Sequence, residues 1–207
     1  MDGYQQVLAF WCGEGFFEQA LSQPDAWPAG AVAKRWFNSS KQDDVLIDEQ
    51  FGELVDEALA GGLEAWEANA ESRLALLLLL DQFPRNIFRG NERAFAGDVR
   101  AAALALAGVE AGMEKSLPVA AQVFFYMPLM HAENRDVQAR CESCFADLQA
   151  RAPAALKPAI ANNLKFAREH RAVIEQFGRF PHRNAVLGRA SSAAELAFLE
   201  TANRYGQ

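Results

Sequence analysis

Apolar residues recur at helical spacing along most of the chain. Six of them form one stripe between residues 43 and 60: Ile47, Phe51, Leu54, Val55, Ala58 and Leu59. Acidic residues lie outside the stripe, and Gly61 and Gly62 follow it. Such a pattern is typical of a surface helix that buries one face and ends at glycine. Residues 72–82 are apolar nearly all round, which predicts a central helix with neighbours on every side.

The same reading places several later helix ends. Asp98 and Ser116 precede apolar periodic segments and are predicted to cap helices. Pro128 is expected to begin a new helix, because proline is tolerated in the first turn. A long amphipathic pattern covers 158–177. Ser192 and Glu195 have the spacing of a capping box, so a final helix is expected to start there.

Composition favours an all-α fold. Alanine and leucine number 39 and 22, against 11 valines, 4 isoleucines and a single threonine. Straight-chain helix formers therefore dominate over β-branched residues, which favour strands. No long linker interrupts the pattern, so residues 1–207 are expected to form a single helical domain. Short connections between successive helices predict antiparallel hairpins, arranged as a bundle or an α-solenoid.

Charge argues against nucleic acid as a partner. The net charge is −7, with 14 acids and 4 bases in residues 1–80 and 13 acids and 16 bases after them. A duplex-binding protein normally carries a basic stripe, which this acidic chain lacks. Fifteen of the 20 basic residues are arginine, the side chain best suited to planar recognition of carboxylate or phosphate.

No membrane association or secretion is expected. The longest unbroken apolar run, Leu74 to Leu80, is far shorter than the roughly 20 residues that span a bilayer. The chain opens without a charged stretch followed by an apolar signal core. Three cysteines are too few for a disulfide framework, which suits the cytoplasm. Cys141 and Cys144 have C-x-x-C spacing, but they fall within a predicted helix and are interpreted as buried side chains.

Two similar segments break the helical pattern. Phe83-Pro84-Arg85-Asn86 and Phe180-Pro181-His182-Arg183-Asn184 each combine an aromatic residue, a proline and an Arg-Asn pair. Proline stops a helix and leaves carbonyl groups without donors, which arginine and asparagine are able to supply. Two roles are therefore open for both segments: helix capping, which is structural, and a functional role.

The three histidines lie near these breaks. His131 follows Pro128, His170 shares a stripe with Phe166 and Val173, and His182 lies inside the second segment. His170 is expected to be at least half buried, and the ordinary fate of such a residue is a hydrogen bond to one carbonyl or carboxylate.

Several segments together resemble the bacterial domain-of-unknown-function family 924. They are residues 74–95, 125–133 and 166–189, the AFLE at 197–200, and Phe10-Trp11-Cys12-Gly13. The resemblance covers nearly the whole chain and implies an all-α, tetratricopeptide-like helical fold, with no established activity. The chain departs from the family at Cys12 and Ala132, where Phe and Ser are often found. If that serine hydroxyl is essential, this member lacks the activity.

A metal site is disfavoured. Three histidines, or two with Glu133 or Asp81, would suffice for a catalytic zinc. No pair has the His-x-x-x-His spacing that places two ligands on one helical face, and Arg85, Arg179 and Arg183 would repel a cation. Phosphate-binding glycine loops and other familiar catalytic motifs are absent from the sequence, so no cofactor is expected.

Our leading hypothesis is a pocket for an anionic small molecule or a peptide carboxylate, formed where the two corners meet the His131 and His170 helices. The expected ligand-binding residues are Arg85, Asn86, His131, His170, Arg179, His182, Arg183 and Asn184. Arginine would supply charge-assisted contacts, and the histidines would complete the wall.

Two alternatives use the same sequence. In the first, the protein is a hydrolase or transferase acting on a small acid or phosphoester, with His131 or His170 as general base and Glu133 or Asp81 orienting it. No nucleophile is evident, so whether the protein is an enzyme stays open. In the second, it is a tetratricopeptide-like scaffold that binds a protein partner on a concave surface.

Overall fold

The computed structural model describes residues 3–201, with the side chains of residues 37 and 38 left out. No strand occurs within that range, and the fold is all-α as the composition predicts. The α-helices are α1 (Gly3–Cys12), α2 (Phe16–Ser22), α3 (Gly30–Asn38), α4 (Lys41–Leu59), α5 (Ala70–Leu77), α6 (Phe83–Ile87), α7 (Asp98–Glu110), α8 (Val119–Met130), α9 (Arg135–Arg151), α10 (Lys157–Phe177) and α11 (Ala193–Thr201).

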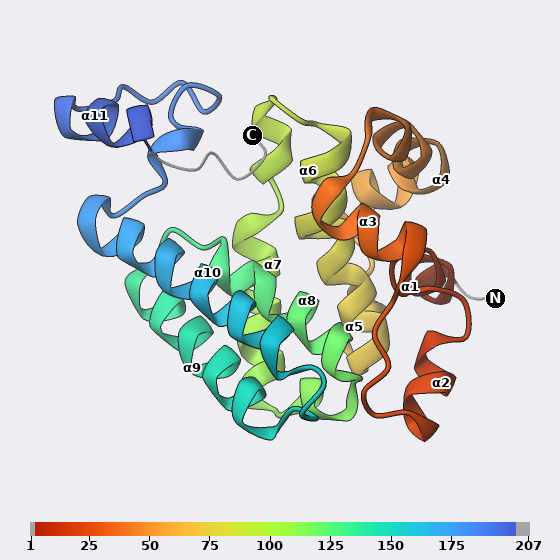
Figure 1. Ribbon diagram of the computed structural model, residues 1–207. Coiled ribbons are helices and arrows are strands. Elements are labelled where there is room, and N and C mark those ends of the chain that lie inside the picture. Colours follow the sequence, from red (N-terminus) through yellow and green to blue (C-terminus); the bar gives the residue numbers. More distant parts are fainter. Residues whose placement is uncertain (1–2, 202–207) are drawn as a thin grey trace.

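Two apolar helices form the centre of the fold. Leu74 to Leu80 are at most 1% exposed, and nearly all of α8 is buried as well. Each fully buried leucine contributes about 1.5–3 kcal/mol from removal of its surface from water. Four helices pack directly on this pair: α1 and α7 against α5, and α7, α9 and α10 against α8 (Figure 1).

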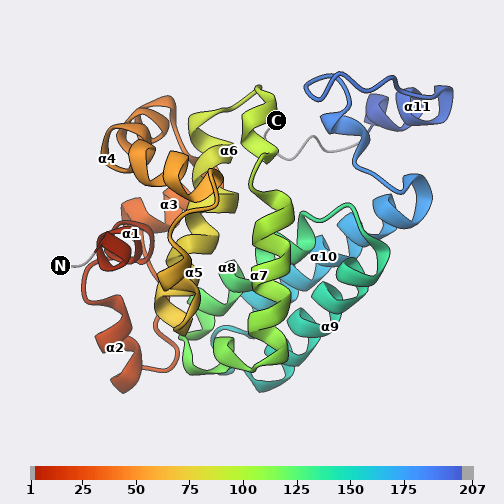
Figure 2. The same cartoon turned by 180° about the vertical axis from the view of Figure 1, so that it is seen from behind.

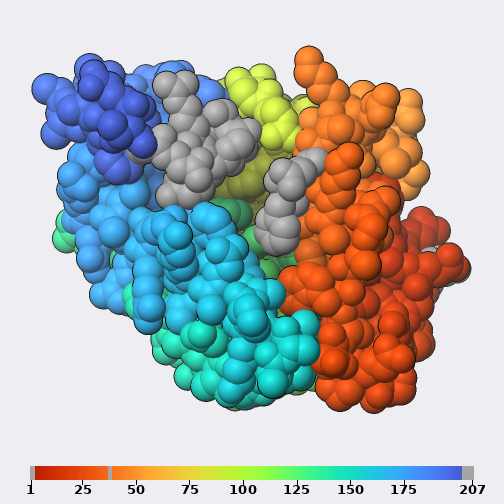
Figure 3. Space-filling model, in the orientation of Figure 1, coloured from red at the N-terminus to blue at the C-terminus, as the bar shows by residue number. Residues whose placement is uncertain are grey.

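The C-terminal half is a run of antiparallel helices. Helices α8, α9 and α10 follow one another through short connections, and α9 and α10 lie side by side along their length in both ribbon views (Figures 1 and 2). In the space-filling view, α10 and α11 lie on one side of the molecule and the N-terminal helices on the other (Figure 3). The end of α10 and the segment that follows it share a small core of their own around Val173, Ile174 and Phe180.

Local signals placed several helix ends correctly. α4 begins with a capping box between Ser40 and Asp43 and ends just before Gly61. α10 covers the predicted long pattern. At the start of α11 the Glu195 carboxylate accepts from the Ser192 backbone N–H, while the Ser192 hydroxyl accepts from the Glu195 N–H, as in a capping box.

Three predicted boundaries are wrong. Pro128 lies inside α8 rather than at the start of a helix, because burial of the whole segment outweighs one missing backbone donor close to the helix end. Ser116 closes a short 3₁₀ turn by donating to the Met113 carbonyl, and α8 starts after Pro118. Asp98 is the first residue of α7, after an N-cap at Gly97, and its carboxylate is used elsewhere.

The predicted break at Phe83-Pro84 is also replaced by a different structure. The chain passes from α5 through one π-helical turn, Leu78–Gln82, directly into α6. A π turn accommodates one extra residue, so the proline is absorbed without ending the helix. As expected from the sequence, two carbonyls of this turn receive side-chain donors: Arg85 donates to the Asp81 carbonyl (2.7 Å) and Asn86 to the Gln82 carbonyl (2.8 Å).

Two further expectations concern cysteines and membranes. Cys12, Cys141 and Cys144 are all buried free thiols, and the latter two lie on α9 as predicted. None of the helices formed by residues 3–201 has the length and hydropathy needed to cross a bilayer.

Gly97 is expected to be sensitive to substitution. A Cβ atom at this position would overlap the Leu80 backbone carbonyl in the π turn, so Gly97→Ala forces α7 away from it. We expect a loss of about 1–3 kcal/mol in the free energy of unfolding. Urea titration measures this against Gly52→Ala, where the added methyl meets only the movable Asp48 side chain. Equal stability of the two variants would contradict this packing.

Candidate functional site

A cavity of about 730 Å³ opens beside α7. One wall is a stripe on α7, at positions i, i+3, i+4 and i+7: Val99, Ala102, Ala103 and Leu106. The opposite wall comes from residues 131–137, where α8 ends and α9 begins, and from Arg183 and Leu187 of the second corner. The polar residues that line the cavity are Glu92, Arg93, Asp98, His131, Glu133, Asn134 and Arg183. Apolar walls combined with a few polar groups are typical of small-molecule sites.

His131 lines the cavity, and its ring is paired with the buried carboxylate of Asp81 behind it. Asp81 Oδ1 lies 2.7 Å from His131 Nδ1. The Asp81 side chain is 1% exposed and that of His131 is 17% exposed. Because a carboxylate accepts, Nδ1 carries the proton of the neutral imidazole, and Nε2 is the nitrogen that remains as an acceptor.

The π turn brings Asp81 to this position. It turns the Asp81 side chain from the apolar run toward the end of α8, where Gln82 Nε2 donates to the second carboxylate oxygen (2.6 Å). Burial alone would raise the pKa of Asp81, but Arg85 and His131 hold that pKa below its usual value. Burial lowers the pKa of His131 in spite of Asp81, so the pair is carboxylate and neutral imidazole at neutral pH.

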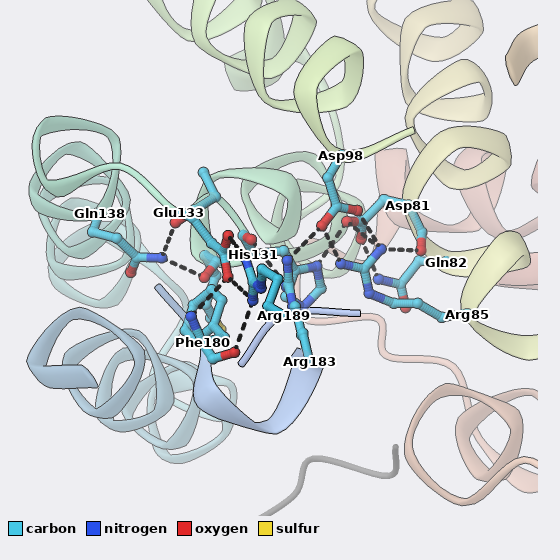
Figure 4. A network of polar contacts seen from close by, with 12 residues as sticks. Asp81, Gln82, Arg85, Asp98, His131, Glu133, Gln138, Phe180, Arg183 and Arg189 are labelled. Carbon is cyan, nitrogen blue, oxygen red and sulfur yellow. Dashed lines mark hydrogen bonds and ion pairs between the residues drawn. The ribbon is translucent and has the colours of Figure 1, made fainter. Parts of the chain in front are cut away.

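Asp98 connects the two corners. Arg85 donates to both of its oxygens (2.8 and 2.9 Å), and Arg183 donates to Oδ2 (2.9 Å). Arg183 also donates to the His131 carbonyl (3.0 Å), which fixes the end of α8. Figure 4 shows the resulting band of contacts, which runs from Arg85 and Asp81 through Asp98 to Arg183.

Arg183 is the most confined cation of the site. Its guanidinium carbon lies 4.6 Å from the ring centres of both Phe95 and Phe180. The residue is 5% exposed, and burial lowers the pKa of its guanidinium to about 10. Its Nε is buried and has no hydrogen-bond acceptor among the described residues.

A second ion pair fastens the C-terminal corner. Arg189 donates to both oxygens of Glu133 (2.7 and 3.0 Å), and the Phe180 backbone N–H donates to Glu133 Oε1 (2.7 Å). Glu133 is therefore committed to this corner and does not bond to a histidine ring among the described residues. Burial acts to raise the pKa of Glu133, but Arg189 and the Phe180 N–H together lower it.

All three histidines lie in one cluster of rings. The centres of the His131 and His170 rings are 6.2 Å apart, and Phe180 lies 5.5 Å from both His170 and His182. His170 Nδ1 contacts the Phe166 carbonyl (2.8 Å), which matches the ordinary fate expected for it. Burial lowers the pKa of His170 to about 3 and that of His182 to about 4.

The structure separates the predicted binding residues into two groups. Arg85, His131, His170 and Arg183 lie together, and His182 reaches them through Phe180. Asp81, predicted as a catalytic candidate, joins this group through His131. Three other predicted binding residues form hydrogen bonds to side chains outside this cluster. Arg179 donates to both Glu195 oxygens (2.7 and 2.8 Å), Asn184 donates to Ser191 (3.0 Å), and Asn86 accepts from Ser39 (2.7 Å).

Sequence reasoning missed two residues that organise the site. The sequence predicts only a capping role for Asp98, and it carries no signal for Arg189, which directly follows the second corner. Ala132, where the resembled family often has serine, lines the cavity beside His131. Within the described part of the chain, no three His, Cys, Asp or Glu side chains are grouped so as to hold a metal ion.

Comparisons with known proteins agree with this architecture. The family model described as a bacterial protein of unknown function, DUF924, matches residues 7–203. A solved structure of a protein of unknown function from Agrobacterium tumefaciens, ATU0120, is 32% identical, with a TM-score of 0.75. The alignment covers 96% of this chain and 97% of that one. No curated protein matches the sequence.

Acid should destabilise the fold through its histidines. An unfolded histidine takes up a proton below pH 6.5, whereas folded His170 does so only near pH 3, so stability falls as pH drops through this window. We expect His170 to account for about 2–3 kcal/mol of the stability lost between pH 6.5 and 4.5. Carboxylates contribute mainly at lower pH.

Urea titrations at the two pH values measure this loss. His170→Asn keeps a donor for the Phe166 carbonyl but does not titrate, so its stability should depend less on pH by that amount. The same pH dependence in the variant and the parent protein would mean that folded His170 already binds a proton in this range.

Proposed function

This chain belongs to the DUF924 family of bacterial proteins of unknown function, which brings no activity with it, and we propose its function from the cavity beside α7. The protein binds a small acid: a molecule with an apolar body and one anionic head group. The observation that carries the proposal is a largely apolar cavity that is lined by Arg183 and by His131, with Asp81 paired behind the His131 ring.

The size and lining of the cavity support a ligand of metabolite size. Its 730 Å³ falls within the range of roughly 300–1,000 Å³ usual for small-molecule pockets. Val99 and Leu106 are seven residues apart, so the α7 stripe is about 10 Å long at 1.5 Å per residue. An apolar body lying along this stripe would bury surface that water now covers.

The charge of the site supports a single negative charge on the ligand. Three carboxylates, Asp81, Asp98 and Glu133, are matched there by three arginines, Arg85, Arg183 and Arg189. Glu92 and Arg93, which also line the cavity, add one charge of each sign. A head group with several charges would find no surplus of positive charge. One carboxylate can share Arg183, the buried arginine that lines the cavity.

His131 supports the same head group through proton uptake. A bound anion stabilises the imidazolium, so it raises the pKa of His131 from its lowered value. Binding then carries a proton with it.

We also place the protein in the cytoplasm, because its three cysteines are free and buried, which suits a reducing compartment.

Filling the cavity should abolish binding without unfolding the protein. Ala103 is exposed on α7 and lines the cavity, so Ala103→Trp occupies the ligand's space without disturbing the core. Octanoate at about 100 times its Kd should add about 2.7 kcal/mol of stability to the parent protein and none to the variant. Thermal melting and isothermal titration calorimetry measure the two effects.

Ala107→Trp is the matched control, because Ala107 is exposed one turn further along α7 and does not line the cavity. It should bind octanoate like the parent protein, while octanol, which lacks the charge, should bind more weakly. Binding that survives in Ala103→Trp, or no acid bound from a library of carboxylates, would refute the proposal. The protein-interaction scaffold would then be the better interpretation.

Binding should strengthen as pH falls from 8 to 6. Burial lowers the pKa of the free His131, and the bound acid favours the protonated ring, so complex formation takes up a proton as the pH is lowered. Calorimetry in two buffers of different ionisation enthalpy measures that uptake directly. In His131→Gln the uptake should disappear. Equal proton uptake by the variant and the parent would assign it to another group.

A further inference from the structure

We propose that the Asp81–His131 pair is a general base that hydrolyses a carboxylic ester bound in this cavity, with water as the nucleophile. The proposal rests on the ligand site proposed above, since the acid that binds there has the chemistry of the reaction's product. It adds a reaction, a substrate class and a role for each of the two residues.

The geometry of the pair is that of an oriented base. Asp81 is 1% exposed and lies 2.7 Å from His131 Nδ1, so it fixes both the ring position and the tautomer. The Nε2 lone pair is then the basic site of a residue that lines the cavity. A carboxylate in this position also stabilises the imidazolium that forms when Nε2 takes a proton.

The cavity itself indicates water as the nucleophile. Among the described residues that line it there is no serine, threonine, cysteine, tyrosine or lysine. A hydroxyl, thiol or amine nucleophile is therefore missing among these residues, and the carboxylates of Asp98 and Glu133 are already paired with arginines. Water held between the base and the ester carbonyl needs only one group to accept its proton.

The reaction balances without a cofactor. The water oxygen attacks the acyl carbon as His131 Nε2 takes one water proton, and the carbonyl becomes a tetrahedral oxyanion. The carbon–alkoxy bond then breaks, and His131 returns the proton to the departing alcohol oxygen. The products are a carboxylic acid, which ionises in water, and an alcohol. No electron is transferred to or from the protein.

Arg183 is placed to stabilise the oxyanion. Its Nη2 lies 3.0 Å from the carbonyl of His131 itself, so the guanidinium is beside the base. Two aromatic rings and Asp98 hold it there, which removes the cost of reorganising a flexible side chain during the reaction. A phosphoester fits less well, because its additional charges would face arginines that are already paired.

The acyl chain is the part of the substrate that the cavity recognises. The apolar stripe on α7 is about 10 Å long, which suits a chain of medium length better than an acetyl group. The probes are accordingly p-nitrophenyl octanoate and p-nitrophenyl acetate, whose leaving groups are identical. The octanoate ester should be hydrolysed with at least a tenfold higher kcat/KM.

The pH dependence of the hydrolysis rate should report the protonation of His131. Charged or titratable groups face His131 from every element around it: Asp81, Arg85, Asp98, His170, His182 and Arg183. His131 itself lies next to the reacting ester, and burial lowers its pKa. The rate should rise with pH through an inflection below 6.5 and then level off.

The experiment measures ester hydrolysis and octanoate binding on the same full-length preparations. The parent protein should hydrolyse p-nitrophenyl octanoate well above the rate in buffer. His131→Gln should lose this activity, and Asp81→Asn should lower kcat at least tenfold and shift the inflection, because an amide no longer fixes the tautomer or stabilises the imidazolium. An unshifted profile in Asp81→Asn would overturn its positioning role.

Two outcomes separate the two proposals. Octanoate binding without hydrolysis above buffer, or hydrolysis that persists in His131→Gln, overturns the catalytic inference and leaves the binding site standing. If the parent protein neither binds octanoate nor hydrolyses the ester, both proposals are refuted. If melting shows that a variant at residue 81 or 131 is unfolded, Ala103→Trp decides: it must be inactive while Ala107→Trp, purified identically, keeps full activity. Activity in Ala103→Trp would assign hydrolysis to another site or a contaminant.

Discussion

The site depends on one carboxylate that is shared by two arginines. Asp98, at the start of α7, accepts from Arg85 of the first corner and from Arg183 of the second, which lies 85 residues further along the chain. Removing charged groups from water is costly, and a buried pair that loses one partner typically destabilises a protein by about 3–5 kcal/mol. This carboxylate therefore holds the two corners in one arrangement, and with them the end of α8 that carries His131.

The fold was predictable from the sequence where local signals decide the structure. The capping box at Ser192, the glycine after α4 and the amphipathic pattern of α10 depend on residues a few positions apart. Pro128 shows the opposite case, because burial of α8 outweighs a local preference. The π turn at Leu78–Gln82 was not predictable, because a run of leucines has the same hydrophobic pattern whether the turn is α-helical or contains one extra residue.

The candidate site was predictable in part for a similar reason. Arg85 follows a proline, and the need for donors near such a residue singled it out. Arg179 met the same criterion, yet it pairs with Glu195, because composition near a helix break does not reveal which acid lies opposite in space. Asp98 and Arg189 gain their roles only from tertiary contacts. The π turn then explains how Asp81, within an apolar run, comes to orient an imidazole.

The central claim is that Asp81 holds His131 as a neutral, Nδ1-protonated base facing an acid-binding cavity. Nitrogen-15 NMR of the histidine rings tests it most directly, with His131→Gln providing the assignment. The account predicts an unprotonated Nε2 in the free protein at neutral pH, and a shift of that resonance when octanoate saturates the cavity. An Nε2-protonated ring, or a resonance that octanoate at saturation leaves unchanged, would contradict it.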